Sequence, residues 1–235
     1  MPVGEKEANM SGKLYAALLD LLFPQKCIFC RKVLRGHESG LCVECAQALA
    51  RPDPLATQGG AYSVCAASLC YSDKVKRAIH RYKFGGRANY AKTFGAIMAD
   101  TIEKELKGRY DIITWVPISA ARKRARGYDQ SMLLAYTIAL ELQDVAVETL
   151  RKTVHNEPQS NLSGAALRRK NVEGVYEVVD PALVKGKRIL LVDDIMTTGS
   201  TLSECASALL GAGATEVVCA VLARPDTGSG RIFKN

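Results

Sequence analysis

RILLVDDIMTTGST, residues 188–201, joins an apolar run typical of a β-strand to an acidic pair and a turn rich in Thr, Gly and Ser. Ligands of open α/β folds bind beyond the carboxyl ends of parallel strands. The unpaired amides at the N-terminus of a following helix favour a phosphate, and a glycine allows the backbone to approach it closely. These residues therefore predict a phosphate site at the edge of a parallel sheet.

The acidic pair, Asp193 and Asp194, narrows the ligand. Two carboxylates would repel a polyphosphate, but they can accept hydrogen bonds from the 2′- and 3′-hydroxyls of a ribose 5-phosphate. The turn residues predicted to hold the phosphate are Met196, Thr197, Thr198, Gly199, Ser200 and Thr201. The turn lacks the lysine of a P-loop and the GxGxxG of a dinucleotide site. The alternative interpretation is a capped helix after a buried strand, with no ligand.

Strand-like and helix-like segments alternate on both sides of this stretch. This alternation, with apolar strand runs, predicts an α/β fold in which helices cover both faces of a parallel sheet. The predicted strands are 62–71, 111–116, 146–150, 175–179, 188–192 and 216–222, and the predicted helices are 74–84, 89–106, 130–142 and 201–212.

Composition limits the class of protein further. The 235 residues are 48% hydrophobic and carry a net charge of +8, which excludes wholesale disorder and favours polyanionic partners. No apolar run approaches the ~20 residues that a membrane span needs, and the first residues lack the basic start of a signal peptide. We therefore expect a cytoplasmic protein. Three parts are predicted: an amphipathic helix within 1–24, a cysteine module at 25–51 and the main domain at 60–235.

Four cysteines form two CxxC pairs within the cysteine module: Cys27, Cys30, Cys42 and Cys45. Two such pairs supply four thiolates, which favours a closed, structural Zn²⁺ site. A redox role is the alternative. The zinc module could also contact nucleic acid by itself.

Basic residues gather in two places. Residues 74–92 hold seven cations and no acid, interleaved with Tyr82, Phe84 and Tyr90, and cations with aromatic rings are typical of single-strand binding. A second cluster follows the predicted strand 111–116, where it suits a diphosphate or a nucleic-acid backbone equally well. The candidate nucleic-acid contacts are Lys74, Lys76, Arg77, Arg81, Lys83, Arg122, Arg124 and Arg126. The alternatives are a solvated basic face or a basic hood over a small anionic ligand.

Several motifs together resemble a known family. VDDIMTTGST resembles the phosphoribosyl pyrophosphate (PRPP) signature of type I phosphoribosyltransferases. The whole arrangement is similar to the ComF family, which is linked in bacteria to competence and the use of external DNA. The other motifs that carry this resemblance are CIFC and CVEC (27–45), YKFGGR (82–87), VPISAARKRARGYDQ (116–130) and QSNLSGAALRRKNVEGVY (159–176).

The resemblance implies roles for particular residues. Asp193 and Asp194 would contact the ribose hydroxyls, and Mg²⁺ would bind the pyrophosphate of PRPP. The pyrophosphate loop would comprise Pro117, Ile118 and Ser119, and a loop over the site would bring in Arg168 and Arg169 as catalytic residues. Hypoxanthine-guanine enzymes have an Asp at the position of Thr197, and Thr cannot serve a purine base in the same way.

Two functions remain open at this point. The first is an enzyme that transfers phosphoribose from PRPP to an unknown acceptor. The second is a non-catalytic accessory protein that binds PRPP or a nucleotide together with single-stranded DNA, in contact with the DNA-uptake machinery.

Overall fold

The computed structural model describes residues 23–36, 38–53, 55–56, 60–153 and 174–225. The predicted N-terminal helix and the segment with Arg168 and Arg169 lie outside these residues. The chain divides into two compact units, Met1–Ala48 and Leu49–Asn235, which we describe separately. No described helix is long and apolar enough to cross a membrane.

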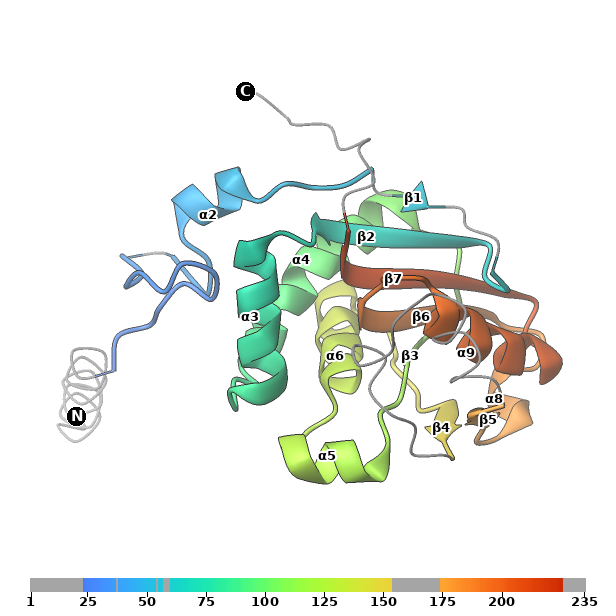
Figure 1. The fold of residues 1–235 in the computed structure, drawn as a ribbon. Helices are drawn as coiled ribbons and strands as arrows, with labels where there is room; N and C mark the ends of the chain where they lie inside the picture. Colours follow the sequence, from blue (N-terminus) through green and yellow to red (C-terminus); the bar gives the residue numbers. More distant parts are fainter. Residues whose placement is uncertain (1–22, 37, 54, 57–59, 154–173, 226–235) are drawn as a thin grey trace, which may run out of the picture. The chain divides into compact units, whose positions relative to one another are not determined.

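The second unit is built on a five-stranded sheet with the order β1-β2-β7-β6-β3 (Figure 1). Strands β2, β7, β6 and β3 are parallel, and only the short β1 runs antiparallel, against β2. The strands are β1 (Leu55–Ala56), β2 (Val64–Cys70), β3 (Ile112–Trp115), β6 (Arg188–Ile195) and β7 (Glu216–Arg224). The predicted parallel sheet is confirmed.

Helices cover both faces of this sheet. Alternate residues of β6 and β7, such as Ile189, Leu191 and Cys219, pack in one apolar cluster with Leu202 and Cys205 of α9 (Ser200–Gly211). The residues between them point to the opposite face. That face is covered by α4 (Tyr90–Glu105) and α6 (Gln130–Leu142), which contact β2, β7, β6 and β3. Burial on both faces explains why these strands are continuous apolar runs.

Three further helices and a small second sheet complete the second unit. α3 (Asp73–Phe84) follows β2, and Ser72 caps it by accepting the Val75 amide. α5 (Ala120–Arg126) follows β3, and α8 (Pro181–Val184) precedes β6. β4 (Leu150–Lys152) pairs antiparallel with β5 (Tyr176–Val178). The first unit contains α2 (Val43–Ala48).

The structure differs from the sequence predictions in three places. β6 extends to Ile195, so Asp193 and Asp194 lie within the strand and not after it, because pairing with β7 continues as far as Ile195 and Ala223. The strand predicted at 146–150 is replaced by a single parallel bridge between Ala146 and Ile113, followed by β4. The short helix α5 escaped prediction because it buries no residue and so shows no apolar period.

Candidate functional site

The turn after β6 forms a tight loop at the N-terminus of α9. Gly199 adopts a left-handed conformation with φ of +74°, and a Cβ atom built there would lie 2.6 Å from the Tyr62 hydroxyl oxygen. That hydroxyl in turn lies 3.7 Å from the Met196 sulfur, and burial raises the pKa of Tyr62 to about 12. Glycine is therefore required at 199 both by its backbone angle and by the packing of Tyr62 beneath the loop.

The loop encloses a polar hollow. The Thr198 and Ser200 hydroxyl oxygens lie 2.8 Å apart, and the Ser200 amide at the start of α9 lies 3.4 Å from the Thr198 hydroxyl oxygen. Amides at a helix N-terminus and hydroxyl groups can donate hydrogen bonds to an anion. The hollow is lined by Asp193, Ile195, Met196, Thr197, Thr198, Gly199, Ser200, Thr201 and Leu202. The structure thus brings the predicted phosphate loop together with the first member of the acidic pair.

The two carboxylates have different surroundings. Asp193 is half-buried, and one of its oxygens accepts hydrogen bonds from the Ser131 hydroxyl and the Asp194 amide, both at 2.9 Å. Asp194 is buried, with Lys83 Nζ of α3 at 2.8 Å from Oδ1 and 2.7 Å from Oδ2. Only Asp193 lines the hollow. Alternation along β6 explains the difference, because successive side chains of a strand point to opposite faces.

The surroundings of Asp193 make it titrate near neutral pH. Burial and the neighbouring charge of Asp194 raise the pKa of Asp193 to about 7, although Lys83 acts in the opposite direction. A carboxyl with this pKa changes charge close to physiological pH, which an ordinary aspartate does not do.

The buried carboxylate of Asp129 holds the predicted pyrophosphate loop in place. Asp129 accepts the Ile118 amide at 3.1 Å and the Met132 amide at 3.2 Å, and so joins residues 117–119 to the start of α6. Pro117 and Ser119 are buried, and Ser119 caps α5. The sequence indicated only that a helix begins near Asp129. Its role beneath the loop depends on contacts across eleven residues.

Two half-buried cations that the sequence analysis did not connect, Lys152 and Arg122, interact electrostatically with each other, and Lys152 also interacts with Asp193. Lys152 Nζ lies 3.4 Å from the Tyr176 hydroxyl and 5.2 Å from the centre of its ring. Burial and the charge of Arg122 lower the pKa of Lys152, and burial and Arg126 lower that of Arg122. Lys152 was missed because it belongs to neither basic cluster.

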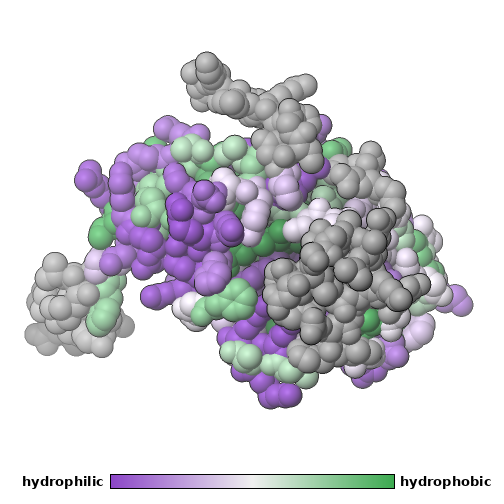
Figure 2. Space-filling view, viewed as in Figure 1, coloured by the Kyte–Doolittle hydropathy of each residue, from purple (hydrophilic) through white to green (hydrophobic). Residues whose placement is uncertain are grey.

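The remaining cations of the basic clusters differ in exposure. Figure 2 shows hydrophilic residues gathered over α3. Lys76, Arg77 and Arg124 are exposed, whereas Lys74 and Arg81 are half-buried. Arg126 lies with its guanidinium carbon 4.8 Å from the centre of the Phe84 ring. Lys83 differs from these residues because it forms an ion pair with Asp194, one of the two acidic residues of the site.

Tyr128 and Gln130 connect the end of α3 to the start of α6. Gln130 is 1% exposed and accepts a hydrogen bond from Arg126 at 2.8 Å. The Tyr128 hydroxyl donates to the Tyr82 carbonyl, and the Tyr82 hydroxyl donates to the Gln130 carbonyl at 2.8 Å. These contacts hold the end of α3 against α6, which fixes where Lys83 can reach.

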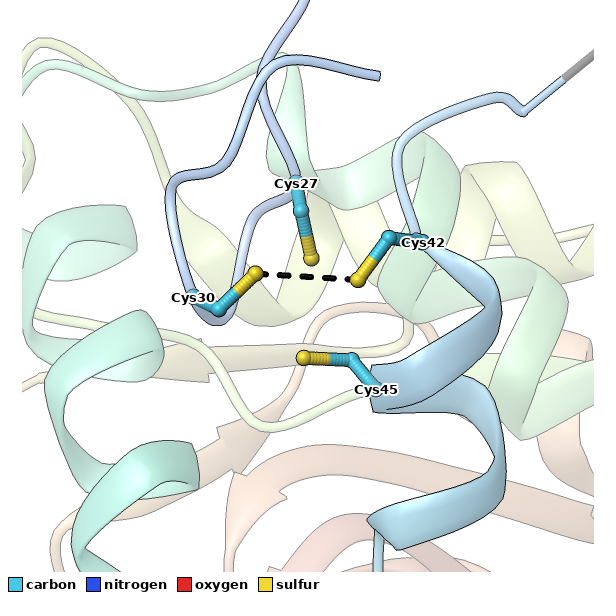
Figure 3. A group of neighbouring side chains, drawn as sticks. All are labelled: Cys27, Cys30, Cys42 and Cys45. Atoms are coloured by element: carbon cyan, nitrogen blue, oxygen red, sulfur yellow. Dashed lines mark hydrogen bonds between the residues drawn. The ribbon is translucent and has the colours of Figure 1, made fainter. Parts of the chain in front are cut away.

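The first unit contains a four-cysteine cluster (Figure 3). Cys27 and Cys30 come from a turn, and Cys42 and Cys45 flank the start of α2. Their sulfur atoms all lie within 4.8 Å of one another, with Cys30 and Cys42 at 3.6 Å. Four thiolates around a tetrahedral Zn²⁺ at ~2.3 Å would be about 3.8 Å apart. The cluster can therefore hold a metal ion, and it is the only group of three or more potential ligands among the described residues.

Comparison with known families agrees with this fold. Residues 129–235 match the phosphoribosyl transferase domain family. The fold of the second unit is therefore phosphoribosyltransferase-like, with a parallel sheet and helices on both faces.

Relatives that match most of the chain confirm the resemblance to the ComF family. The DNA utilization protein YhgH of Escherichia coli K12 is 29% identical over 224 residues, covering 85% of this chain and 97% of the relative. Competence protein F of Haemophilus influenzae is 27% identical, covering 86% and 98%. Competence protein ComFC of Bacillus subtilis is 28% identical over 143 residues, covering 61% and 56%.

Among solved structures, the chain is similar to glutamine PRPP amidotransferase from B. subtilis complexed with ADP and GMP. The TM-score is 0.42 at 24% identity, over 60% of this chain and 30% of that chain.

Proposed function

We propose that the second unit binds PRPP or a related ribose 5-phosphate. The observation that carries the proposal is the position of Asp193, a hydroxyl acceptor that lines the same hollow as the phosphate loop 196–201. The phosphate would accept hydrogen bonds from amides at the N-terminus of α9 and from the hydroxyls of the loop, and the ribose hydroxyls would donate to Asp193. Mg²⁺ would be held by the pyrophosphate of the ligand.

Calorimetry with PRPP and Mg²⁺ tests this proposal. Asp193→Asn removes the charged acceptor, and loss of a charge-assisted hydrogen bond costs ~1.5–3 kcal/mol, so affinity should fall about tenfold to a hundredfold. Asp180→Asn is the matched control, because Asp180 caps α8 and Asn can do the same. Equal PRPP affinities for the wild type and Asp193→Asn would contradict this ligand geometry.

We propose further that the bound PRPP transfers its phosphoribosyl group to an acceptor. The bond from C1 of the ribose to the pyrophosphate would break, the bond from C1 to the acceptor would form, and pyrophosphate would leave. Lys152 and Arg122, which are half-buried, would stabilise the leaving charge, together with Arg168 and Arg169 as proposed from the sequence. Pyrophosphate release from PRPP, assayed across amines, nucleobases and oligonucleotides, tests this step. If PRPP binds but no acceptor releases pyrophosphate, the protein is a binding protein only.

For the cysteine cluster we propose a structural Zn²⁺ site. All four ligands are thiols, which leaves no open position for a substrate. Purified protein should carry one zinc per chain, and Cys42→Ser should release it. Cys70→Ser, at a buried cysteine of β2 outside the cluster, is the control. Full zinc retention in Cys42→Ser would disprove the assignment.

A second candidate function is contact with single-stranded DNA, and it draws support from one exposed aromatic residue. Phe84 is 61% exposed at the end of the basic helix α3, with Arg126 against its ring. Base stacking on an aromatic ring beside cations is how sequence-independent single-strand binding works. The names of the relatives, which refer to DNA utilization and competence, favour the same role in the use of external DNA.

Salt-dependent binding of an oligonucleotide tests the DNA contact. Each phosphate contact contributes about −0.7 to the slope of log affinity against log salt concentration. Replacing Lys76, Arg77 and Arg81 with Ala should flatten that slope, and PRPP affinity should change little. Phe84→Ala should weaken binding without changing the slope, while Leu140→Ala, at an exposed apolar residue of α6, should do neither. If the triple variant loses PRPP instead, these cations belong to the ribose-phosphate site.

A further inference from the structure

The contact between Lys83 and Asp194 joins two parts of the chain that lie 111 residues apart and that no sequence motif connects. Lys83 lies in the last turn of α3, and both oxygens of Asp194 lie within 2.8 Å of its ammonium nitrogen. This ion pair is largely buried, with side-chain exposures of 21% for Lys83 and 10% for Asp194. An ion pair in such surroundings is screened much less by water and salt than a surface pair.

The acidic pair needs a counter-ion for electrostatic reasons. Asp193 and Asp194 are adjacent, and two carboxylates that share a secluded site do not both ionise readily. Lys83 neutralises the negative charge of Asp194, so Asp193 remains to accept hydrogen bonds.

We propose that Lys83 is a positioning residue of the ribose-phosphate site: its ammonium group offsets the charge of Asp194, so that Asp193 can ionise and accept hydrogen bonds from the hydroxyls of an anionic sugar. This inference rests on the proposed function, and it deepens it by adding α3 to the site. It also explains how an anionic ligand tolerates two carboxylates, because Lys83 offsets the charge of one of them.

Other titratable groups also surround the pair. Among the described residues, those with an electrostatic effect that involves one of the two carboxyls include Tyr82 of α3, Lys152 of β4, Tyr176 of β5, Cys205 of α9, Cys65 of β2 and Cys219 of β7. The cation among them, Lys152, interacts with Asp193. The three thiols and the two phenols are neutral near pH 7, since burial raises the pKa of each.

Removing Lys83 should weaken the binding of ribose 5-phosphate at neutral pH. A nearby cation favours the ionised form of a carboxyl, so its removal raises the pH at which the pair loses its last proton. Because the pKa of Asp193 is about 7, a midpoint one pH unit higher would leave about a tenth of the pair fully ionised at pH 7, in place of about half. The affinity for ribose 5-phosphate at pH 7 should then fall about fivefold and recover towards pH 9.

The experiment measures two quantities in the full-length chain. Carboxyl ¹³C NMR follows the titration of Asp193 and Asp194 without ligand, and calorimetry follows ribose 5-phosphate binding from pH 6 to pH 9. Lys83→Met should move both midpoints upwards, and Lys83→Arg should restore them. Lys104→Met is the control, because it breaks an exposed lysine–aspartate pair with Asp100 on α4. Comparison between variants at each pH cancels the titration of the ligand itself.

A further variant separates charge from folding. Lys83→Met leaves Asp194 buried without a counter-ion, which is destabilising, whereas adding Asp194→Asn removes that charge and leaves Asp193 alone. The midpoint of Asp193 should return downwards in this double variant. If the pair titrates identically in the wild type and Lys83→Met, the role of Lys83 is overturned, even if ribose 5-phosphate still binds. If neither ribose 5-phosphate nor PRPP binds the wild type at any pH, the proposed function fails first and this role fails with it.

Discussion

Gly199 shows how strongly a single residue constrains the phosphate loop. A side chain at this position meets two penalties, the positive φ of 74° and a Cβ approach of 2.6 Å to the Tyr62 hydroxyl. The first costs ~1–2 kcal/mol and the second adds ~1–3 kcal/mol. Gly199→Ala should therefore lower the free energy of unfolding by about 2–5 kcal/mol in denaturant titrations.

Two further variants separate these penalties. Gly186→Ala, at a φ of +72° with no atom within 4 Å of the new Cβ, should show the backbone cost alone. Adding Tyr62→Phe to Gly199→Ala removes the nearest atom and should recover part of the loss. Equal costs at positions 186 and 199 would contradict the proposed clash.

At the same scale, the sequence predicted some site residues and could not predict others. Asp193 and the loop 196–201 were predictable because they are contiguous, so their spacing alone places them beside a helix N-terminus. The contact of Lys83 with Asp194 spans 111 residues, and that of Ser131 with Asp193 spans 62. Nothing local in the sequence marks Lys83 as different from the other cations of α3.

Among the secondary-structure elements, β3 and β6 are joined at the end opposite the site. Arg188 donates to Asp111 through both its amide, at 2.8 Å, and its guanidinium, at 2.6 Å. These hydrogen bonds lower the pKa of Asp111 to about 2. A depressed folded-state pKa stabilises the fold above the ordinary value near 3.9, and this contribution is lost as the pH falls from about 4 to about 2.

The expected result is a difference in acid sensitivity. Asp111→Asn should have a lower midpoint of thermal unfolding than the wild type at pH 6, and the gap should narrow by pH 2.5. Arg188→Met in the Asp111→Asn background should change little further at either pH. A gap that stays constant with pH would show that Asp111 acts through its shape and not through its charge.

The elements themselves were largely predictable where one face or both are buried. The helix predicted at 130–142 coincides with α6, which Asp129 caps, because an N-cap and an apolar face mark its limits. The end of β6 could not be predicted, since it depends on pairing with β7. The β4–β5 pair was missed as a separate sheet because its strands have only three residues each.

At the level of the whole molecule, the two compact units should respond differently to metal removal. The described part of the first unit, residues 23–36 and 38–48, is too short to build an apolar core, and its buried cysteines, Cys27, Cys42 and Cys45, belong to the cluster. Segments of this size are usually folded by the metal itself. The second unit has its own extensive core around the sheet.

We therefore expect a strong zinc chelator to unfold the first unit and leave the second unit folded. Amide hydrogen exchange should show loss of protection in residues 23–48 and unchanged protection in β6 and β7. PRPP affinity should remain within about twofold of the untreated protein, because the proposed ligand contacts all lie in the second unit. Cys42→Ser should reproduce the exchange pattern without chelator, and Cys70→Ser should not. Chelation could instead abolish PRPP binding while β6 and β7 stay protected. The cysteine module would then contribute to the ligand site, and the proposal that all ligand contacts lie in the second unit would be wrong.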